Sequence, residues 1–363
     1  MDDVGENQIT IKDQIKKFAL KSLIGYQTVL VYGLGYRLGI FDYLYKKGKK
    51  LEEINRISEL NFSVDELSKE LGLDFRYIDG WLHMGLECGL FEIDQSSKKT
   101  FKPVIFVYDI LINRDNMFFI GGTLMGFYLS SLIQDIWFNN FKTGKLVNIL
   151  TMPSEMIQIG QNICTTSGIR TEELFSTKFK DKKRALRQGG SILEVGCGYG
   201  YNLAIWAKKY KKAKIIGIDI DPKGLKQAKQ MVEENNWNDR IQILEIKINE
   251  FANFYKEQFD LIMLNHVLHE INPDEIYRQQ VLNDLYGLLK VDGILIVGEH
   301  IIPSIYEPKK EFNFFEIWHK WYETPANSVF YNEETFKALI NKTLFEKADL
   351  IKERGDYFWA LKK

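Results

Sequence analysis

Residues 191–200 combine side chains and backbone groups that can hold a charged small molecule. An apolar run contains the acidic residue Glu194, and glycines follow at every second position: Gly196, Gly198 and Gly200. Glycine lets the backbone turn tightly and approach a ligand closely, so the amides of this loop can bind an anionic group such as a carboxylate. The spacing differs from the dinucleotide fingerprint G-x-G-x-x-G, because Tyr201 occupies the place of its third glycine.

A second acidic residue ends the next apolar run. Residues 213–220 are rich in isoleucine and carry Asp219 near their end. A carboxylate at the end of the second strand of such a unit can accept hydrogen bonds from two ribose hydroxyls. Neighbouring Asp221 directly precedes Pro222, which instead suits the first turn of a helix. The sequence therefore predicts Asp219 as a ribose ligand.

The elements around these residues alternate between strand and helix. We expect strands at 191–195, 213–220, 241–248, 259–264 and 294–298, helices at 202–209, 221–235 and 274–289, a turn at 290–293, and a terminal hairpin of 348–352 with 356–361. The alternation predicts an α/β, Rossmann-like domain of seven strands, with helices on both faces and ligands at the carboxyl ends of the strands.

The N-terminal part has a different pattern, which predicts a mainly α domain. Residues 61–103 contain a short helix with Ser63 and Glu66 as a capping box, a turn, a second helix at 75–86 and a β-wing. This order predicts a winged helix. The second helix offers only Arg76 and His83 to a nucleic acid, so we expect packing or dimerisation and no nucleic-acid partner.

Composition sets further limits. The chain has 363 residues, 45% of them apolar and 27% charged, with a net charge of −1, which is typical of a soluble protein of two domains. Three separated cysteines argue against a disulfide framework and, with no apparent secretory signal, favour the cytoplasm: Cys88, Cys164 and Cys197. Residues 117–134 carry no charge; their glycines and polar side chains favour a buried helix, with a membrane span as the alternative.

Taken together, the loop 194–200, Asp219, the strand 259–264 and the closing hairpin resemble the class I S-adenosylmethionine (SAM)-dependent methyltransferases. With the winged helix, the chain is similar to the small-molecule O-methyltransferases, which dimerise through such a module. The resemblance implies a dimerisation domain at 1–110, a helical connector at 111–185 and a methyltransferase domain at 186–363. It also implies SAM as cofactor, a homodimer, and cofactor-binding residues at Glu194, Gly196, Gly198, Gly200, Asp219, Asn249 and Asn265.

Catalytic candidates follow the fourth strand. The family has a Leu-His-Asp-Trp signature there, in which the histidine is the general base; this chain has Leu-His-Glu-Ile, so His269 matches and the tryptophan is absent. Glu299 matches the family carboxylate that orients this histidine, whereas the family's second carboxylate falls near Phe330, which is not acidic. A phenol with a pKa of about 10 gains from a base that titrates near neutrality, which explains the choice of histidine.

Aromatic residues at helical spacing follow the last parallel strand, at 314–322. Core packing is their ordinary role, but the family covers its acceptor with this segment. We expect acceptor contacts from Phe315, Trp318, Tyr322 and His266, and we expect His319, which lies off this stripe, to be exposed. Because His266 and His269 have no third ligand in sight, we expect no metal site.

The sequence thus predicts a SAM-dependent methyltransferase acting on a small apolar or aromatic acceptor, with a hydroxyl as the favoured methyl acceptor. Four alternatives remain open. The same fold can methylate carbon or nitrogen, or use SAM in a reaction without methyl transfer. From another class, the chain can be a winged-helix regulator that senses SAM, or an inactive partner subunit.

Overall fold

The computed structural model describes residues 10–94, 97, 99–148, 151–162, 165–302, 314–353 and 356–363, with all their side chains except those of 19 and 162–167. The chain divides into two compact units, 1–131 and 132–363, and each is described by itself. The three-part division given above, with its dimerisation role for 1–110, stays a prediction.

The first unit begins with helices that pack closely through small residues. Gly39, with a φ of +76°, ends α2 and allows α3 to leave in a new direction. A Cβ on Gly33 would lie 2.2 Å from the Tyr128 ring, so only glycine permits this contact between α2 and α6. The helical segments here are α1 (Ile11–Ile15), η1 (Lys16–Leu20), α2 (Lys21–Arg37), α3 (Ile40–Glu52), η2 (Ile57–Glu59), η3 (Tyr108–Ile112) and α6 (Gly121–Leu132).

The short helix, second helix and β-pair expected at 61–103 are present. Ser63 accepts a hydrogen bond from the Glu66 amide at 3.1 Å, while the Glu66 carboxylate accepts one from the Tyr43 hydroxyl. The second helix buries Trp81, whose Nε1 donates to the Val31 carbonyl at 2.8 Å. This helix therefore packs against α2 with its apolar side. The four elements are α4 (Val64–Leu71), α5 (Phe75–Glu87), β1 (Phe91–Ile93) and β2 (Phe101–Pro103).

Residues 121–132 of the uncharged segment 117–134 form helix α6, which has only 12 residues. Met125 and Leu129 are buried on it, and the Tyr128 ring faces α2. Across the part of the chain that the structure describes, every helix is too short or too polar to cross a membrane. The segment therefore forms a helix that is partly buried, and its place at a domain or subunit interface stays a prediction.

The second unit is built on one mixed sheet with the strand order β5-β4-β3-β6-β7-β9-β8. The first five of these strands are parallel, and β9 enters antiparallel between β7 and β8, as the expected terminal hairpin requires. The seven-stranded, Rossmann-like architecture is confirmed. Its strands are β3 (Ser191–Val195), β4 (Lys214–Asp219), β5 (Ile241–Glu245), β6 (Phe259–Asn265), β7 (Leu289–Gly298), β8 (Ala348–Glu353) and β9 (Asp356–Lys362).

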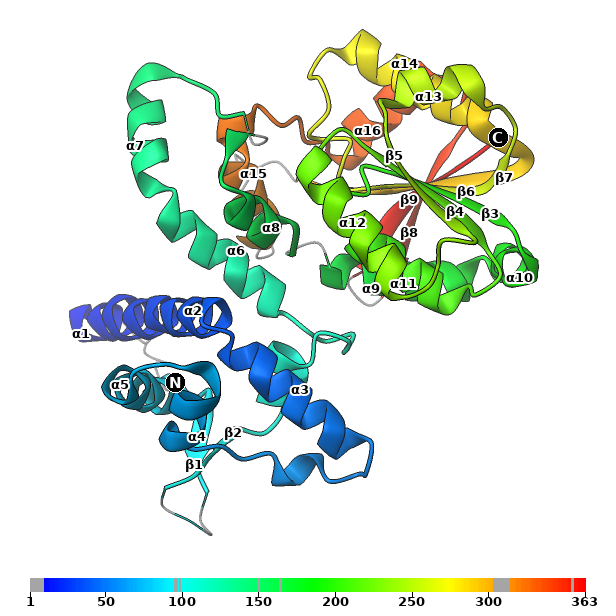
Figure 1. Cartoon of the computed structure of the whole chain (residues 1–363). Helices are drawn as coiled ribbons and strands as arrows, with labels where there is room; N and C mark the ends of the chain where they lie inside the picture. Colours follow the sequence, from blue (N-terminus) through cyan, green and yellow to red (C-terminus); the bar gives the residue numbers. More distant parts are fainter. Residues whose placement is uncertain are drawn as a thin grey trace, which may run out of the picture. The chain divides into compact units, whose positions relative to one another are not determined.

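Helices cover both faces of this sheet (Figure 1). Adjacent strand residues point into different cores, since Ile192 packs with one helix layer and Leu193 with the other. One layer contains α9 (Thr165–Lys178), α10 (Lys180–Gln188), α11 (Tyr201–Lys209) and α12 (Pro222–Glu234); the other contains α13 (Ile248–Phe254), α14 (Glu275–Leu288) and α16 (Glu333–Ile340). Apolar runs without alternation are the expected result of burial on both faces.

Two local expectations are wrong. The strand expected at 241–248 ends at Glu245, and Ile248 already belongs to helix α13. The second is the turn expected at 290–293. Residues 290–293 belong to strand β7, which begins at Leu289, although their sequence predicts a turn. The register shifts between Phe259 and Leu261, so the extra residues of β7 are accommodated as an irregularity in the sheet. The remaining segments of this unit are α7 (Gln134–Thr143), α8 (Ser154–Asn162), α15 (Phe314–Tyr322) and η5 (Thr324–Ala326).

Candidate active site

The glycine loop after β3 adopts a conformation that requires its glycines. Gly196, Gly198 and Gly200 have φ values of +71°, +47° and +78°, a region that other residues adopt at a cost. Space is also restricted: a Cβ on Gly196 would lie 2.3 Å from the Val267 side chain, and one on Gly198 would lie 2.1 Å from Gln161 Oε1. The loop is thus enclosed by segments that follow β6 and precede β3.

Asp219 ties this loop to the end of β4. Its Oδ2 accepts a hydrogen bond from the Gly198 amide at 2.7 Å, and its Oδ1 accepts from the amides of Ile220 and Asp221 at 2.6 and 2.9 Å. Burial raises the pKa of Asp219 above its ordinary value, against the opposing effect of these amides. Asp221 caps α12 through the amides of Lys223 and Gly224, as the sequence indicates.

Glu194 is buried with one oxygen available. Its Oε1 accepts a hydrogen bond from Asn202 Nδ2 at 2.8 Å, whereas Oε2 has no hydrogen-bond partner among the described residues. Burial raises the pKa of Glu194 to about 8. A buried acceptor beside a glycine loop fits a ligand that carries both a cationic and an anionic group, as the methionine part of SAM does.

The other two predicted cofactor residues have different surroundings. Asn265, the last residue of β6, has a buried Oδ1 without a hydrogen bond in the described structure. Asn249, in the first turn of α13, is exposed. Of these two residues, Asn265 therefore has the surroundings that suit a bound polar ligand.

Helix α8 contributes glutamines that the sequence analysis did not identify. Gln161 Oε1 accepts a hydrogen bond from the Tyr199 amide at 3.2 Å, and Gln158 Nε2 donates to the Tyr201 hydroxyl at 3.2 Å. Both residues lie in a stretch that reads as a connector, and two glutamines three residues apart on an amphipathic helix were the available signal. Gln161 thus contacts the glycine loop itself, and Gln158 contacts the first residue of the helix that follows it.

The sheet brings His269 and Glu299 together. Asn265 at the end of β6 pairs with Gly298 at the end of β7, so the residues that follow the two strands leave from the same edge. His269 Nδ1 lies 2.5 Å from Glu299 Oε2, and the His269 amide donates to Glu299 Oε1 at 3.3 Å. Both side chains are buried, at 1% and 3% exposure. This contact assigns the proton of neutral His269 to Nδ1 and leaves a lone pair on Nε2.

A second carboxylate reaches His269 from an unexpected position. Glu323 Oε2, just after α15, lies 3.3 Å from His269 Nε2, while the Phe330 ring stacks on the imidazole at 5.0 Å. Burial alone would lower the pKa of His269, but the charges of Glu299 and Glu323 outweigh it and raise that pKa well above its ordinary value. Two acidic neighbours therefore favour the protonated imidazole.

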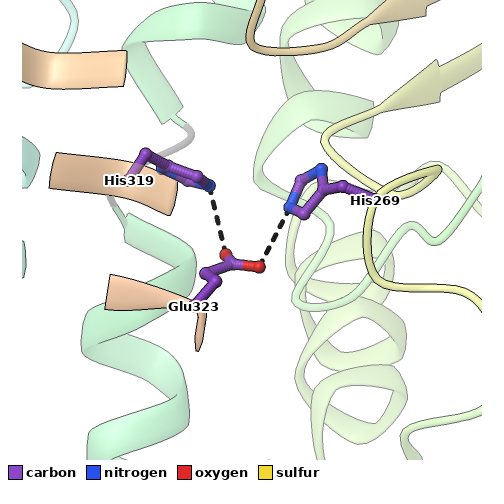
Figure 2. Close-up of side chains that lie close together, drawn as sticks. All are labelled: His269, His319 and Glu323. Carbon is purple, nitrogen blue, oxygen red and sulfur yellow. Dashed lines mark ion pairs between the residues drawn. The ribbon is translucent and has the colours of Figure 1, made fainter. Parts of the chain in front are cut away.

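The expectation that His319 is exposed is wrong. Its side chain is buried, and its Nε2 lies 3.1 Å from Glu323 Oε1, so that one carboxylate sits between two imidazoles (Figure 2). The buried face of α15 contains Trp318 and His319, whereas Phe315 is 54% exposed. The aromatic stripe is therefore only partly buried.

Three of the predicted acceptor residues lie on α15, and the fourth, His266, directly follows β6. Trp318 and the half-buried Tyr322 stack at 5.4 Å on α15. His266 has a φ of +54°, and its amide donates to the Gly298 carbonyl at 2.7 Å. Its ring lies 4.8 Å from that of His300, and burial lowers its pKa to about 4. A strained backbone at the end of a parallel strand is frequent at functional sites.

Residues 186–349 match the protein family described as methyltransferase domain. This region of the chain therefore resembles a methyltransferase domain. The ribosomal protein L11 methyltransferase of Thermosipho africanus is 32% identical over 163 residues, which are 45% of this chain and 56% of that protein. The chain thus spans little more than half of this curated relative.

Solved structures of methyltransferases are similar in fold to nearly the whole chain. The mitomycin 7-O-methyltransferase is 13% identical with a TM-score of 0.62, covering 97% of this chain and 98% of that one. Human N-acetylserotonin methyltransferase, solved in complex with SAM, is 15% identical with a TM-score of 0.63 and covers 99% of both chains. At such identities the likeness establishes the fold. The predicted resemblance to class I methyltransferases is confirmed for the domain and the architecture.

Proposed function

We propose that this chain transfers the methyl group of SAM to a hydroxyl of a small apolar or aromatic molecule. The observation that carries the proposal is the buried His269–Glu299 pair, with a 2.5 Å contact, beside the glycine loop. Val267, two residues before His269, fills the space above Gly196. A candidate proton acceptor and a candidate cofactor loop therefore share one edge of the sheet.

The residues around the loop fit SAM in charge and shape. We assign its carboxylate to the amides of the glycine loop, its ammonium to the side of Glu194, and its ribose to Asp219. Asn265 and Asn249 complete the proposed set. When bound, SAM supplies a methyl group on a sulfonium, which needs an aligned and deprotonated acceptor more than it needs further activation.

His269 would take the proton of the acceptor. His269 Nε2 would accept the proton that the acceptor hydroxyl loses when it takes the methyl group from SAM, which would leave as S-adenosylhomocysteine. Glu299 acts as a positioning residue, because it holds Nδ1 and so turns Nε2 away from itself. Only the neutral imidazole can act in this way, and Glu299 and Glu323 both disfavour it. We therefore expect turnover to rise with pH.

The acceptor site is assigned to the surroundings of this histidine. We assign contacts with the acceptor to Trp318, Tyr322 and His266. Phe315, a more exposed residue of α15, completes this set. Aromatic walls with a few polar groups suit a flat, apolar molecule. We also propose that the chain acts in the cytoplasm as a homodimer formed through residues 1–110, without nucleic acid or membrane as partner.

Calorimetry and product analysis test the proposal. S-adenosylhomocysteine should bind to the wild type and to His269→Ala alike, while His269→Ala should lose most of its turnover with a phenolic acceptor. Loss of the general base costs roughly 10²–10⁴-fold in rate. Absence of binding to the wild type would refute the cofactor assignment, and unchanged turnover of His269→Ala would refute the base.

A second candidate keeps the donor and changes the acceptor atom. The raised pKa of His269 favours a reaction that needs no strong base, such as methylation of an amine or a carbon, or a SAM-assisted reaction without methyl transfer. The likeness to a ribosomal protein L11 methyltransferase is compatible with an acceptor other than a small alcohol. The mass and fragmentation of the product separate these outcomes. Salt-dependent DNA binding would favour a regulator, and binding without turnover an inactive partner subunit.

A further inference from the structure

Four of the five histidines of the chain gather at one point of the second unit. The rings of His300 and His319 are 3.9 Å apart, and that of His269 lies 5.4 Å from His319. The fifth, His83, is exposed in the first unit. A single general base needs only one of these rings. Because imidazole is a common ligand of metal ions, a group of several histidines is a candidate metal site.

We propose that His269, His319 and Glu323 form a binding site for a divalent transition metal ion such as Zn²⁺ or Co²⁺. Their candidate ligand atoms all lie within 4.8 Å of one another. The Glu323 carboxylate lies 3.3 Å from His269 Nε2 and 3.1 Å from His319 Nε2. Ligands at bonds of 2.0–2.1 Å in a tetrahedral site are about 3.4 Å apart, so both separations already suit an ion.

The three side chains converge from separate segments. His269 follows β6, whereas His319 and Glu323 lie four residues apart on one side of α15 and its end (Figure 2). All three are at least nine-tenths buried. Two imidazoles and one carboxylate suit zinc, iron and cobalt, and three protein ligands leave a position open for a further ligand.

A second observation is the incomplete contact of His319. Its Nε2 is buried and lies 3.1 Å from Glu323 Oε1, but the geometry gives it no hydrogen bond among the described residues. A buried polar atom without a hydrogen bond costs free energy, and a bound cation would remove that cost. The two imidazole nitrogens and the carboxylate lie close enough to one another to share one ion.

The other ring nitrogen of His269, Nδ1, has the contact that is usual in a metal-binding histidine. Metal-binding histidines usually donate their other ring proton to a carboxylate, which fixes the ring and makes the coordinating nitrogen more basic. His269 Nδ1 donates to Glu299 Oε2 in this manner, at a distance of 2.5 Å. The contact with Glu299 therefore suits His269 as a metal ligand as well as it suits His269 as a general base.

One consequence concerns the proposed reaction, on which this part of the inference rests. An ion bound to His269 Nε2 uses the lone pair that would accept the acceptor's proton. Metal binding and general-base catalysis by His269 therefore exclude each other, and the ion is expected to inhibit methyl transfer to a hydroxyl. Binding itself needs no catalysis and is measured separately.

The test uses the full chain after removal of metals with a chelator. Calorimetry with Zn²⁺ and visible absorption with Co²⁺ should show one bound equivalent, with the cobalt bands expected of a site of low coordination number. His319→Ala and Glu323→Gln should each weaken binding by at least tenfold. His83→Ala is the matched control, because it removes a histidine outside the cluster and should bind as the wild type does.

Binding of S-adenosylhomocysteine to each variant reports whether it is folded. Absence of saturable binding by the wild type, or equal binding by His319→Ala and Glu323→Gln, would overturn the site; a proton on His269 would then be what balances Glu323. Turnover that is unchanged at saturating Zn²⁺ would overturn the placement of the ion on His269 Nε2. If the chain binds the metal but forms no methylated product even after the metal is removed, the proposed function is refuted and the metal site stands.

Discussion

The glycine loop allows a quantitative test through Gly198→Ala. The new Cβ would lie 2.1 Å from Gln161 Oε1, so the two must separate by about 1.3 Å to reach an ordinary contact of 3.4 Å. A residue other than glycine at a φ of +47° adds roughly 1–2 kcal/mol of backbone strain. If the loop moves, it also weakens the 2.7 Å bond from the Gly198 amide to Asp219.

The expected effect on binding follows from that bond. Hydrogen bonds to charged groups contribute about 1.5–3 kcal/mol, and 1.4 kcal/mol corresponds to tenfold in affinity. We therefore expect Gly198→Ala to raise the Kd of S-adenosylhomocysteine by about tenfold or more. Calorimetry measures this Kd, and a thermal melt records stability at the same time.

Gly144→Ala is the matched control. Gly144 has a φ of +66° at the end of α7, and a Cβ there would meet no atom within 4 Å. Gly144→Ala should therefore introduce the same backbone strain as Gly198→Ala without a steric clash. We expect it to lower Tm and leave the Kd unchanged. The double variant Gly198→Ala with Gln161→Ala should recover part of the affinity. Wild-type affinity in Gly198→Ala would refute the assignment of this loop to the cofactor.

Three further predictions follow from other contacts. Glu323→Gln removes one of two carboxylates that raise the pKa of His269, so this pKa falls and the acidic limb of a kcat–pH profile should move to lower pH; an unmoved limb would contradict His269 as the base. Asp219→Ala should weaken S-adenosylhomocysteine binding in calorimetry, and equal affinity would exclude the ribose contact. On α13, Phe251→Ala should cost about 3–5 kcal/mol in urea unfolding because Phe251 is fully buried, whereas Phe254→Ala, at a 76% exposed site, should change little; equal losses would contradict the packing of α13.

The sequence was informative where local pattern determines structure. The β-branched runs predict the strands because a parallel sheet buries both faces. The spacing of Gly196, Gly198 and Gly200 predicts a tightly turning loop, and the structure gives all three glycines positive φ values. Asp219 and His269 could be located because their strands end at one edge of the sheet. In these cases, the position of a residue at or just after the end of a strand was enough to propose its role.

The sequence was less informative where contacts join distant residues. Glu323 lies 54 positions after His269, and no periodicity links the two. The spacing of the aromatic stripe on α15 places His319 on the solvent side, yet Glu323 Oε1 and the His300 ring lie beside the His319 ring. Polar pairs buried across the fold are set by tertiary packing, which local hydrophobicity does not encode.

The position of β9 has a consequence for how the protein is made. Residues 356–362 come last among the strands, yet β9 lies between β7 and β8 in the sheet. While a ribosome is still adding these residues, at roughly 5–20 per second, the outer edge of β7 has no neighbour and β8 has nothing to pair with. Open strand edges invite pairing with other chains. The nascent chain therefore passes through a period of exposure to aggregation that ends only when its final strand closes the sheet.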